Sequence, residues 1–289
     1  MSLEVWIEQF YQPSDADDWS HAYRRALGYW IGYTNEGGFS DDTRDFTLRF
    51  MAKEYTFNDS IDVVRGMHLV GSGGSGFPNG TRFLFPAGID GIIVHHVIHL
   101  QPPGKAADDI VLTNHDLEIS NRGLTLATIP VPPGMNGLRG TGTVIERLSV
   151  DALNAALGAA PKEAHGIAVR TTCVLRDLYI NIFSGNGIDI RAWVPTWNAN
   201  SWQVQNCLIG NCHDGLYCWG SDVNAGCAID VSCTGNRGWG IWDASLLGNT
   251  YIACHCDGNR EGAYRTGTAR DGSARGVFGK SIARVLCRG

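Results

Sequence analysis

The sequence predicts an all-β protein, a parallel β-helix closed at its N-terminal end by one amphipathic helix. Three observations predict this solenoid: a turn phrase that recurs at nearly constant spacing, alternation of apolar and polar residues before each copy, and a high glycine content. Glycine accounts for 37 of the 289 residues, well above the usual ~7%, and it follows no Gly-X-Y period. Frequent tight turns between short strands explain such a composition.

The first predicted element is a helix within the segment PSDADDWSHAYRRALGYWIG. Ser14 or Asp15 can cap it, and acidic residues fill the first turn, where they interact favourably with the helix dipole. Apolar residues recur there at helical spacing: Trp19, Ala22, Tyr23, Ala26 and Trp30. We therefore expect residues 1–40 to form an N-terminal cap and residues 41–289 to form the β-helix.

Short apolar runs follow the helix, among them DFTLRFM, EYTF, IDVV, MHLVG and TRFLF. Each is broken by Gly, Asn, Asp or Pro, which is typical of short strands joined by turns. The run DALNAALGAA (151–160) interrupts this pattern, and we expect an inserted loop or helix around residues 150–162. From residue 165 onwards the pattern again predicts strands and turns.

The turn phrase is Gly-Asn, followed within a few residues by a second Gly and an apolar residue. Its asparagines are Asn186, Asn211, Asn236 and Asn259, at intervals of 25, 25 and 23 residues. A period of this length indicates a repeat architecture. Gly and Asn adopt positive φ most readily, and an Asn at the same turn of each coil can hydrogen-bond to the next coil. We predict that the four asparagines stack in one column.

The residues before each Asn alternate in polarity, as a half-buried strand requires. In the last three copies, the residues seven, five and three positions before the Asn are expected to face the core: Val204, Asn206, Leu208, Ile229, Val231, Cys233, Ile252, Cys254 and Cys256. The first copy has the opposite parity at Leu178, Ile180 and Ile182, which predicts a bulge there. The nine cysteines form no Cys-x-x-Cys pair, so we expect small core residues rather than a zinc site or a disulfide framework.

Several segments carry a resemblance to a known family: DDWSHAYRRAL, EYTFNDSIDVVRGMHLVGSGG, TRFLFPAGIDGIIV and the Gly-Asn coils. Together they resemble the pectate-lyase-like superfamily of right-handed parallel β-helices, over roughly residues 14–100 and 140–270. The resemblance implies a carbohydrate-active protein of bacterial or phage origin, virion-associated or extracellular. Members include polysaccharide lyases, glycoside hydrolases, uronan epimerases, and phage tailspikes or depolymerases. The catalytic signatures of polygalacturonases, pectate lyases and mannuronan epimerases are absent from the chain.

Aromatic residues of the repeats are the candidate contacts for a polysaccharide. Two residues after the second Gly of each copy stand Asp189, Tyr217, Trp242 and Tyr264, in a column expected to point outward. Exposed aromatic rings at a repeating height can stack on sugar rings; alternatively, longer loops cover them and they form a secondary core. The candidate substrate-binding residues are Tyr217, Trp219, Trp239, Trp242, Tyr264, His213 and Arg237.

Two carboxylates of the repeats are the first candidates for catalysis. Asp214 and Glu261 each precede the second Gly of their copies. They are expected two coils apart, about 9–10 Å at the ~4.8 Å spacing of neighbouring strands. This is near the separation that inverting glycosidases use, although two solvated turn carboxylates remain the alternative. Asp189 and Arg191 are the second pair of candidates, since a lyase needs a base and a group that neutralises the uronate carboxylate.

The charge and the ends of the chain limit its partners. A formal net charge of −6 and a pI near 5.8 argue against nucleic acid, and no apolar run reaches the ~18 residues of a membrane span. The start MSLEVWIEQFYQ shows no secretion signal. We expect no metal or cofactor, except calcium in the case of a lyase. The strand-like end GVFGKSIARVLCRG would expose a sheet edge, which favours a homotrimer or a longer chain.

Two classes of function remain after this reasoning. The first is binding and depolymerisation of a polysaccharide by a lyase or a glycoside hydrolase. The second is a non-catalytic structural or adhesin-type β-helix, such as a virion fibre segment or a glycan-binding module.

Overall fold

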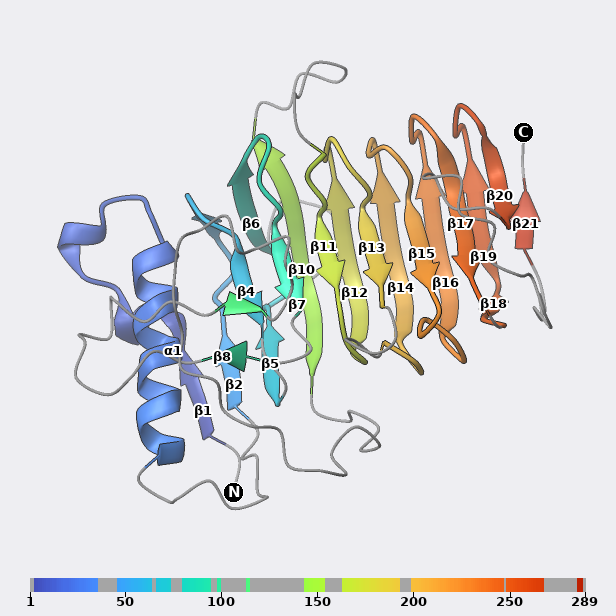
Figure 1. Cartoon of the computed structure of the whole chain (residues 1–289). Helices are drawn as coiled ribbons and strands as arrows, with labels where there is room; N and C mark the ends of the chain where they lie inside the picture. The colour runs from blue at the N-terminus through green and yellow to red at the C-terminus, as the bar shows by residue number, and fades with distance from the viewer. Residues whose placement is uncertain are drawn as a thin grey trace.

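Two long parallel sheets and one helix form a right-handed parallel β-helix in the computed structural model of the chain (Figure 1). The structure describes residues 3–35, 46–63, 66–73, 80–94, 98–99, 113–114, 143–153, 163–192, 199–246, 248–267 and 285–287. Successive coils lie side by side along the solenoid, with the helix at its N-terminal end. The fold class predicted from the repeats is confirmed.

The first sheet has twelve strands, and most neighbours in it are one coil apart. Its strands are β1 (Leu3–Trp6), β2 (Phe46–Arg49), β3 (Glu54–Thr56), β5 (Met67–Val70), β6 (Thr81–Pro86), β10 (Val144–Leu153), β12 (Val174–Asn181), β14 (Gln203–Gly210), β16 (Cys227–Thr234), β18 (Thr250–Ile252), β19 (Cys254–Asp257) and β21 (Val285–Cys287).

The second sheet has seven strands and faces the first across the core. Its strands are β4 (Ile61–Val63), β7 (Ile92–Val94), β11 (Ile167–Val169), β13 (Ile188–Arg191), β15 (Leu216–Gly220), β17 (Trp239–Ser245) and β20 (Gly262–Thr266). A short antiparallel pair, β8 (Ile98–His99) and β9 (Thr113–Asn114), lies outside both sheets. Inward side chains of the two sheets share one hydrophobic core.

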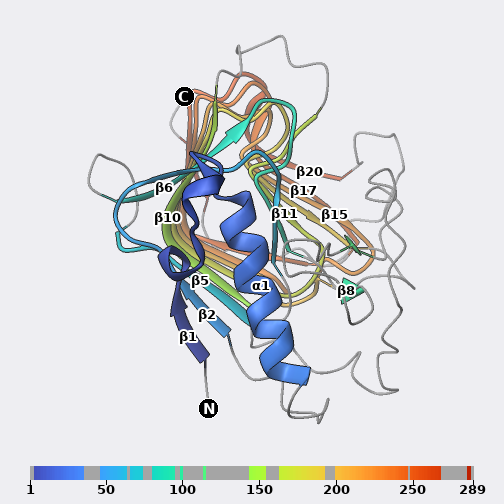
Figure 2. The ribbon, with the colours of Figure 1, turned by 90° about the vertical axis from the view of Figure 1, so that its left-hand side faces the viewer.

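The N-terminal helix α1 (Ser20–Asn35) covers the end of the core, as Figure 2 shows. Ala22, Tyr23 and Ala26 are buried, as their helical spacing predicts. The helix begins later than predicted: two short 3-10 turns, η1 (Ile7–Phe10) and η2 (Pro13–Asp15), precede it. Asp15 does not cap it, because its carboxylate accepts the Gln12 N–H and pairs with Arg25.

A bulge in five successive coils of the first sheet, from β10 onwards, changes the predicted alternation. In β10, β12, β14 and β16, and between β18 and β19, one residue has positive φ, between 48° and 58°: Arg147, Asp177, Asn206, Asp230 and Ala253. The bulge predicted in the first copy is present at Asp177, and the later copies have a bulge as well, which the alternation did not reveal. Before such a residue, the inward and outward positions of the strand exchange places, because the bulge adds one residue without adding an inward side chain.

The core positions follow from these bulges. Among the nine residues predicted to face inward, Val204, Val231, Cys233, Cys254 and Cys256 are buried. The prediction is wrong for Asn206, Leu208, Ile229 and Ile252, which lie on the outer side, and the two isoleucines are 37% and 39% exposed. The seven buried cysteines are free thiols, and burial raises the pKa of Cys212 to about 12.

The predicted column of four asparagines is wrong, because only two of them stack. Asn236 donates from its backbone N–H and its Nδ2 to Asn259 Oδ1, at 3.1 and 2.8 Å. Asn211 instead has positive φ, 55°, in the turn position that Gly235 and Gly258 fill in the next coils. Asn186 lies in another column, described below. One more residue between the turn and the sheet is enough to move an Asn out of the stack.

The second Gly of the phrase is explained by close packing between coils. A Cβ on this glycine would lie 2.5–3.0 Å from the carbonyl oxygen of the residue one coil further on. This column consists of Gly91, Gly166, Gly187, Gly215 and Gly240. None of them has positive φ among the described residues, so the glycine is required by space rather than by backbone conformation.

The helix predicted at 151–160 does not begin there. Residues 151–153 end strand β10, where Asp151 pairs with Asn181 of the next coil. Residues 154–162 lie outside the described part of the chain, as do Trp193, Trp197, His95 and His96. The strand-like C-terminal segment is described only at β21, which pairs with β19.

Candidate functional site

A column of side chains at the turn into the second sheet links successive coils. His165 N–H donates to Asp90 Oδ1 at 2.7 Å, and Asn186 N–H donates to His165 Nδ1 at 2.9 Å. Two coils further on, Trp239 N–H donates to Asp214 Oδ1 at 2.6 Å. One side chain therefore accepts the backbone N–H of the next coil, which gives the column a structural role.

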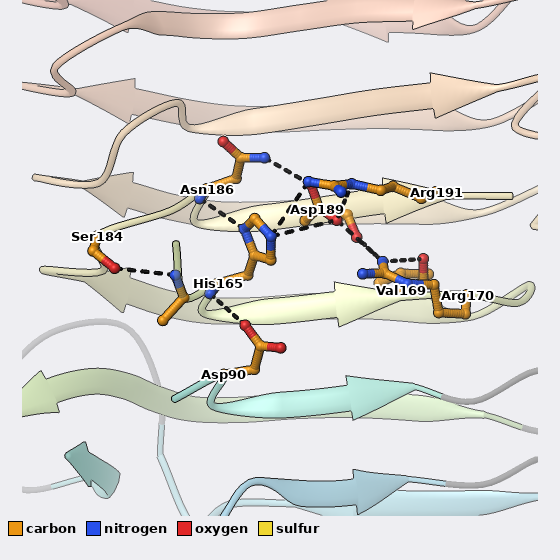
Figure 3. Close-up of polar contacts among 9 residues, drawn as sticks. Asp90, His165, Val169, Arg170, Ser184, Asn186, Asp189 and Arg191 are labelled. Atoms are coloured by element: carbon orange, nitrogen blue, oxygen red, sulfur yellow. Dashed lines mark hydrogen bonds and ion pairs between the residues drawn. The ribbon is translucent and has the colours of Figure 1, made fainter. Parts of the chain in front are cut away.

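Asp189 is the centre of a buried ionic cluster beside this column (Figure 3). It occupies the outward middle position of β13 and is fully buried. Arg191 Nε lies 2.8 Å and Arg170 Nη1 3.1 Å from Asp189 Oδ2. Asn186 Nδ2 donates to Oδ1 at 2.7 Å, and His165 Nε2 lies 3.9 Å from Oδ2.

These neighbours keep Asp189 ionised. Burial alone would raise the pKa of Asp189, but Arg191, His165 and Arg170, with the Asn186 hydrogen bond, hold it well below its usual range. A carboxylate of such low pKa is a poor general acid or base near neutral pH. Asp189 therefore positions the two arginines. Since the arginines bring two positive charges to one negative charge, the cluster has an excess of positive charge.

The hydrogen bonds of His165 define its tautomer. Its Nδ1 accepts the Asn186 N–H, so in the neutral ring the proton is on Nε2. This nitrogen faces Asp189 and lies 3.4 Å from Arg191 Nη2. His165 is buried, with 6% exposed, and it orients the cluster rather than offering a free lone pair to a ligand.

Tyr217 and Trp242 form a second hydrophobic cluster on the outside of the second sheet. Their ring centroids are 5.2 Å apart, and the residues are only 3% and 4% exposed. Partly buried Trp219 and Trp239 pack against them. The expectation of open platforms is therefore wrong for Tyr217 and Trp242, whose burial matches the secondary core, while Trp219 and Trp239 keep an exposed part.

The last coil differs by one residue from the predicted alignment. Tyr264 pairs with Ile241, and its ring packs on Tyr251 of the core, so it is not part of the outward column. Arg265 takes the outward place beside Trp242. The shift arises because Gly262 pairs with Trp239 rather than with Gly240.

The same shift separates the predicted carboxylate pair. Asp214 is fully buried, and its Oδ1 accepts the Trp239 N–H. Glu261 is exposed, and its N–H donates to the Gly238 carbonyl, one residue before Trp239. The two residues thus occupy different positions of their coils.

The remaining candidates lie at the turns. Arg237 Nη2 donates to the carbonyls of Phe183 and Ser184 at 3.0 and 2.8 Å, which ties its turn to an earlier coil. The His213 side chain is 41% exposed, with Nδ1 3.5 Å from Asp214 Oδ1. Among the described residues, the hydrogen bonds of the Arg237 side chain go to these two carbonyls and not to the Asp189 cluster.

The structure brings together two predicted residues, Asp189 and Arg191, and two that sequence reasoning missed, His165 and Arg170. A signal for the missed pair exists in the sequence. HGIAVR at 165–170 repeats NGIDIR at 186–191, so His165 and Arg170 stand one coil before Asn186 and Arg191. This earlier copy lacks the Gly-Asn phrase that defined the repeat.

Among the described residues, no three His, Cys, Asp or Glu side chains gather as they would around a metal ion. No described helix has the length and apolar character needed to cross a membrane.

Comparison with known proteins supports the fold. No protein-family model and no curated protein matches the sequence. ORF18 of Geobacillus virus E2 matches with a TM-score of 0.54 and 13% identity, over 99% of this chain and 48% of that one. The Dettilon tailspike protein matches with a TM-score of 0.49 and 9% sequence identity, over 95% of this chain and 48% of that chain. The A-module of Azotobacter vinelandii mannuronan C-5 epimerase AlgE4 matches with a TM-score of 0.48 and 10% sequence identity, over 97% of this chain and 73% of that chain.

The chain thus spans about half the length of the first two proteins. At 13% identity, the first likeness concerns the fold alone.

Proposed function

We propose that this chain binds a polysaccharide along the outer face of the second sheet and cleaves it beside Arg191. The ionic cluster around Asp189 is the observation that carries this proposal. Neighbouring coils place Ile93 and Ala168 at the position of Asp189, so the coil itself does not need a charge there. Buried charges are costly, and strongly perturbed buried groups concentrate at functional sites.

Arg191 is the residue of the cluster that reaches the surface. Its side chain is 18% exposed, compared with 5% for Arg170. Its guanidinium carbon lies 5.7 Å from the ring centre of Trp219, which is itself partly exposed. A sugar ring on Trp219 would therefore bring an acidic substituent within reach of a guanidinium that Asp189 holds in place.

Arg191 suits one part of an elimination, the neutralisation of a uronate carboxylate. In β-elimination a base takes the proton next to the uronate carboxylate, and the electron pair of that carbon–hydrogen bond forms the carbon–carbon double bond as the bond to the leaving oxygen breaks. The leaving oxygen takes its proton from the protonated base or from water. Arg191 would neutralise the carboxylate, which stabilises the carbanion-like transition state. Hydrolysis needs two facing carboxyl groups, and Asp214 and Glu261 do not face each other in this way.

A non-catalytic glycan-binding fibre segment is the second candidate function. The burial of Tyr217 and Trp242 favours it, because these rings stabilise the solenoid whether or not a ligand is cleaved. Both candidates place the polysaccharide on the same face, so they differ only in turnover.

The test is incubation with a panel of acidic polysaccharides while both the ultraviolet absorbance of unsaturated uronates and the reducing ends are followed. We expect both signals to rise together. A rise of reducing ends alone would indicate hydrolysis instead. Binding without either signal would support the fibre segment, and the absence of binding to every polymer would refute the proposal.

A further inference from the structure

The guanidinium of Arg265 takes part in none of the ion pairs that are formed among the described residues. Its guanidinium carbon lies 4.2 Å from the ring centre of Trp242 and 5.6 Å from that of Trp239. Arg170 and Arg191, in contrast, contact Asp189. An arginine stacked on an aromatic face keeps the N–H groups at its edge available for a planar anion.

Trp239 supplies a second donor beside Arg265. Its Nε1 is buried and has no hydrogen-bond partner among the residues that the structure describes. Its ring lies against Gly262, where a Cβ would come within 2.6 Å of Trp239 Cζ3, so the glycine makes room for the indole. Buried donors in proteins are rarely left unpaired, and a ligand acceptor would satisfy this one.

We infer that Arg265 and Trp239 form a subsite for an acidic group of the ligand, separate from the Asp189 cluster. This inference rests on the proposed function, because it places the subsite on the same polysaccharide-binding face. Arg265 is on β20, three strands beyond β13, which carries Arg191; three strands span about 14 Å at the ~4.8 Å spacing of strands. Arg265 is in register with Asp189, two residues before Arg191 along the strand. A polymer running along the solenoid axis would contact both arginines.

The residues between the two arginines narrow the class of polymer. The outward middle positions of β15 and β17 hold Tyr217 and Trp242, which are uncharged and buried. Strands β15 and β17 contain no Arg, Lys or His, so a charged group of the ligand between the two arginines would lose hydration without a further cation to pair with. The ligand is therefore an acidic polysaccharide in which charged sugars are separated by uncharged ones.

The experiment is a tryptophan-fluorescence titration of the whole chain with three polymers: hyaluronan, acidic at alternate sugars; polygalacturonate, acidic at every sugar; and neutral dextran. We expect hyaluronan to bind most tightly. Arg265→Gln should weaken hyaluronan binding roughly tenfold to hundredfold, as the loss of a hydrogen bond to a charged group does. Trp239→Phe should weaken it roughly two- to tenfold. Arg260→Gln, an exposed arginine just before β20, is the matched control and should bind as the parent does.

Each other outcome has a definite meaning. Equal binding by the parent and Arg265→Gln would overturn the subsite and leave the proposed function intact. Tightest binding of dextran or polygalacturonate would overturn the class of polymer. If no polymer binds, while inorganic sulfate changes the fluorescence of the parent but not of Arg265→Gln, the proposed function fails and the anion subsite stands. If sulfate has no effect either, both fail.

Discussion

Truncation of Asn236 tests the stacking between coils most sharply. Asn236 is 1% exposed. Its Oδ1 accepts the Cys212 N–H at 3.0 Å, and its Nδ2 donates to Asn259 Oδ1 at 2.8 Å. Asn236→Ala leaves the buried Cys212 N–H without its acceptor, and an unsatisfied buried group costs about 1–3 kcal/mol. We expect the free energy of unfolding to fall by that amount.

The assay is urea unfolding followed by circular dichroism, with Asn211→Gly as the matched control. Asn211 is exposed and has φ of 55°, and glycine fills the same turn position as Gly235 and Gly258 in the following coils. The control gives up one partly buried hydrogen bond, from Asn211 Nδ2 to Asn181 Oδ1 at 2.9 Å, which contributes about 1 kcal/mol, while glycine adopts positive φ without strain. Its loss of unfolding free energy should therefore be smaller than that of Asn236→Ala. A loss below about 0.5 kcal/mol in Asn236→Ala, or an equal loss in both variants, would refute the reasoning.

Three further predictions concern packing, pH and assembly. Gly215→Ala should lower the melting temperature strongly, because its Cβ would lie 2.5 Å from the Gly240 carbonyl oxygen. Gly73→Ala is the control, since its Cβ would meet nothing closer than 3.7 Å. Equal melting temperatures of the two variants would contradict this prediction. The lowered pKa of Asp189 gives stability that is fully present above the unfolded value of ~3.9 and is lost as pH falls through the folded pKa. As pH falls, the free energy of unfolding should therefore decrease less steeply in Asp189→Asn than in the parent. Identical slopes of unfolding free energy against pH would count against an ionised Asp189. Light scattering should show a homotrimer, and a monodisperse monomer at high concentration would exclude it.

The fold was predictable because its repeat contains positions where the close approach of neighbouring backbones requires glycine. The second glycine recurs in five successive coils of the second sheet, since a Cβ there would strike the next coil, and this recurrence indicates a solenoid. The core parity was less predictable. Residues as different as Arg147, Asn206 and Ala253 occupy the bulge, so no residue type marks it, and the inward positions shift by one beyond it.

The site was predictable only in part, for a related reason. Asp189 and Arg191 lie in a copy with the Gly-Asn phrase, whereas Arg170 lies in a copy without it. Tyr264 and Arg265 exchange places because β20 is displaced by one residue, which a comparison of glycine positions cannot detect. The burial of Tyr217 and Trp242 depends on tertiary packing, which the repeat does not encode.

Turnover by Arg191→Gln tests the central claim, that the Asp189 cluster is the place of polysaccharide cleavage. The measurement is the initial rate of unsaturated product formation on a polysaccharide that the parent cleaves. Arg176→Gln is the control, because Arg176 pairs with Glu146 on the outer face of the first sheet. We predict that Arg191→Gln lowers kcat by roughly 10²–10³, as the loss of one transition-state donor does, while Arg176→Gln leaves it unchanged. An Arg191→Gln variant that is folded and as active as the parent would contradict the account.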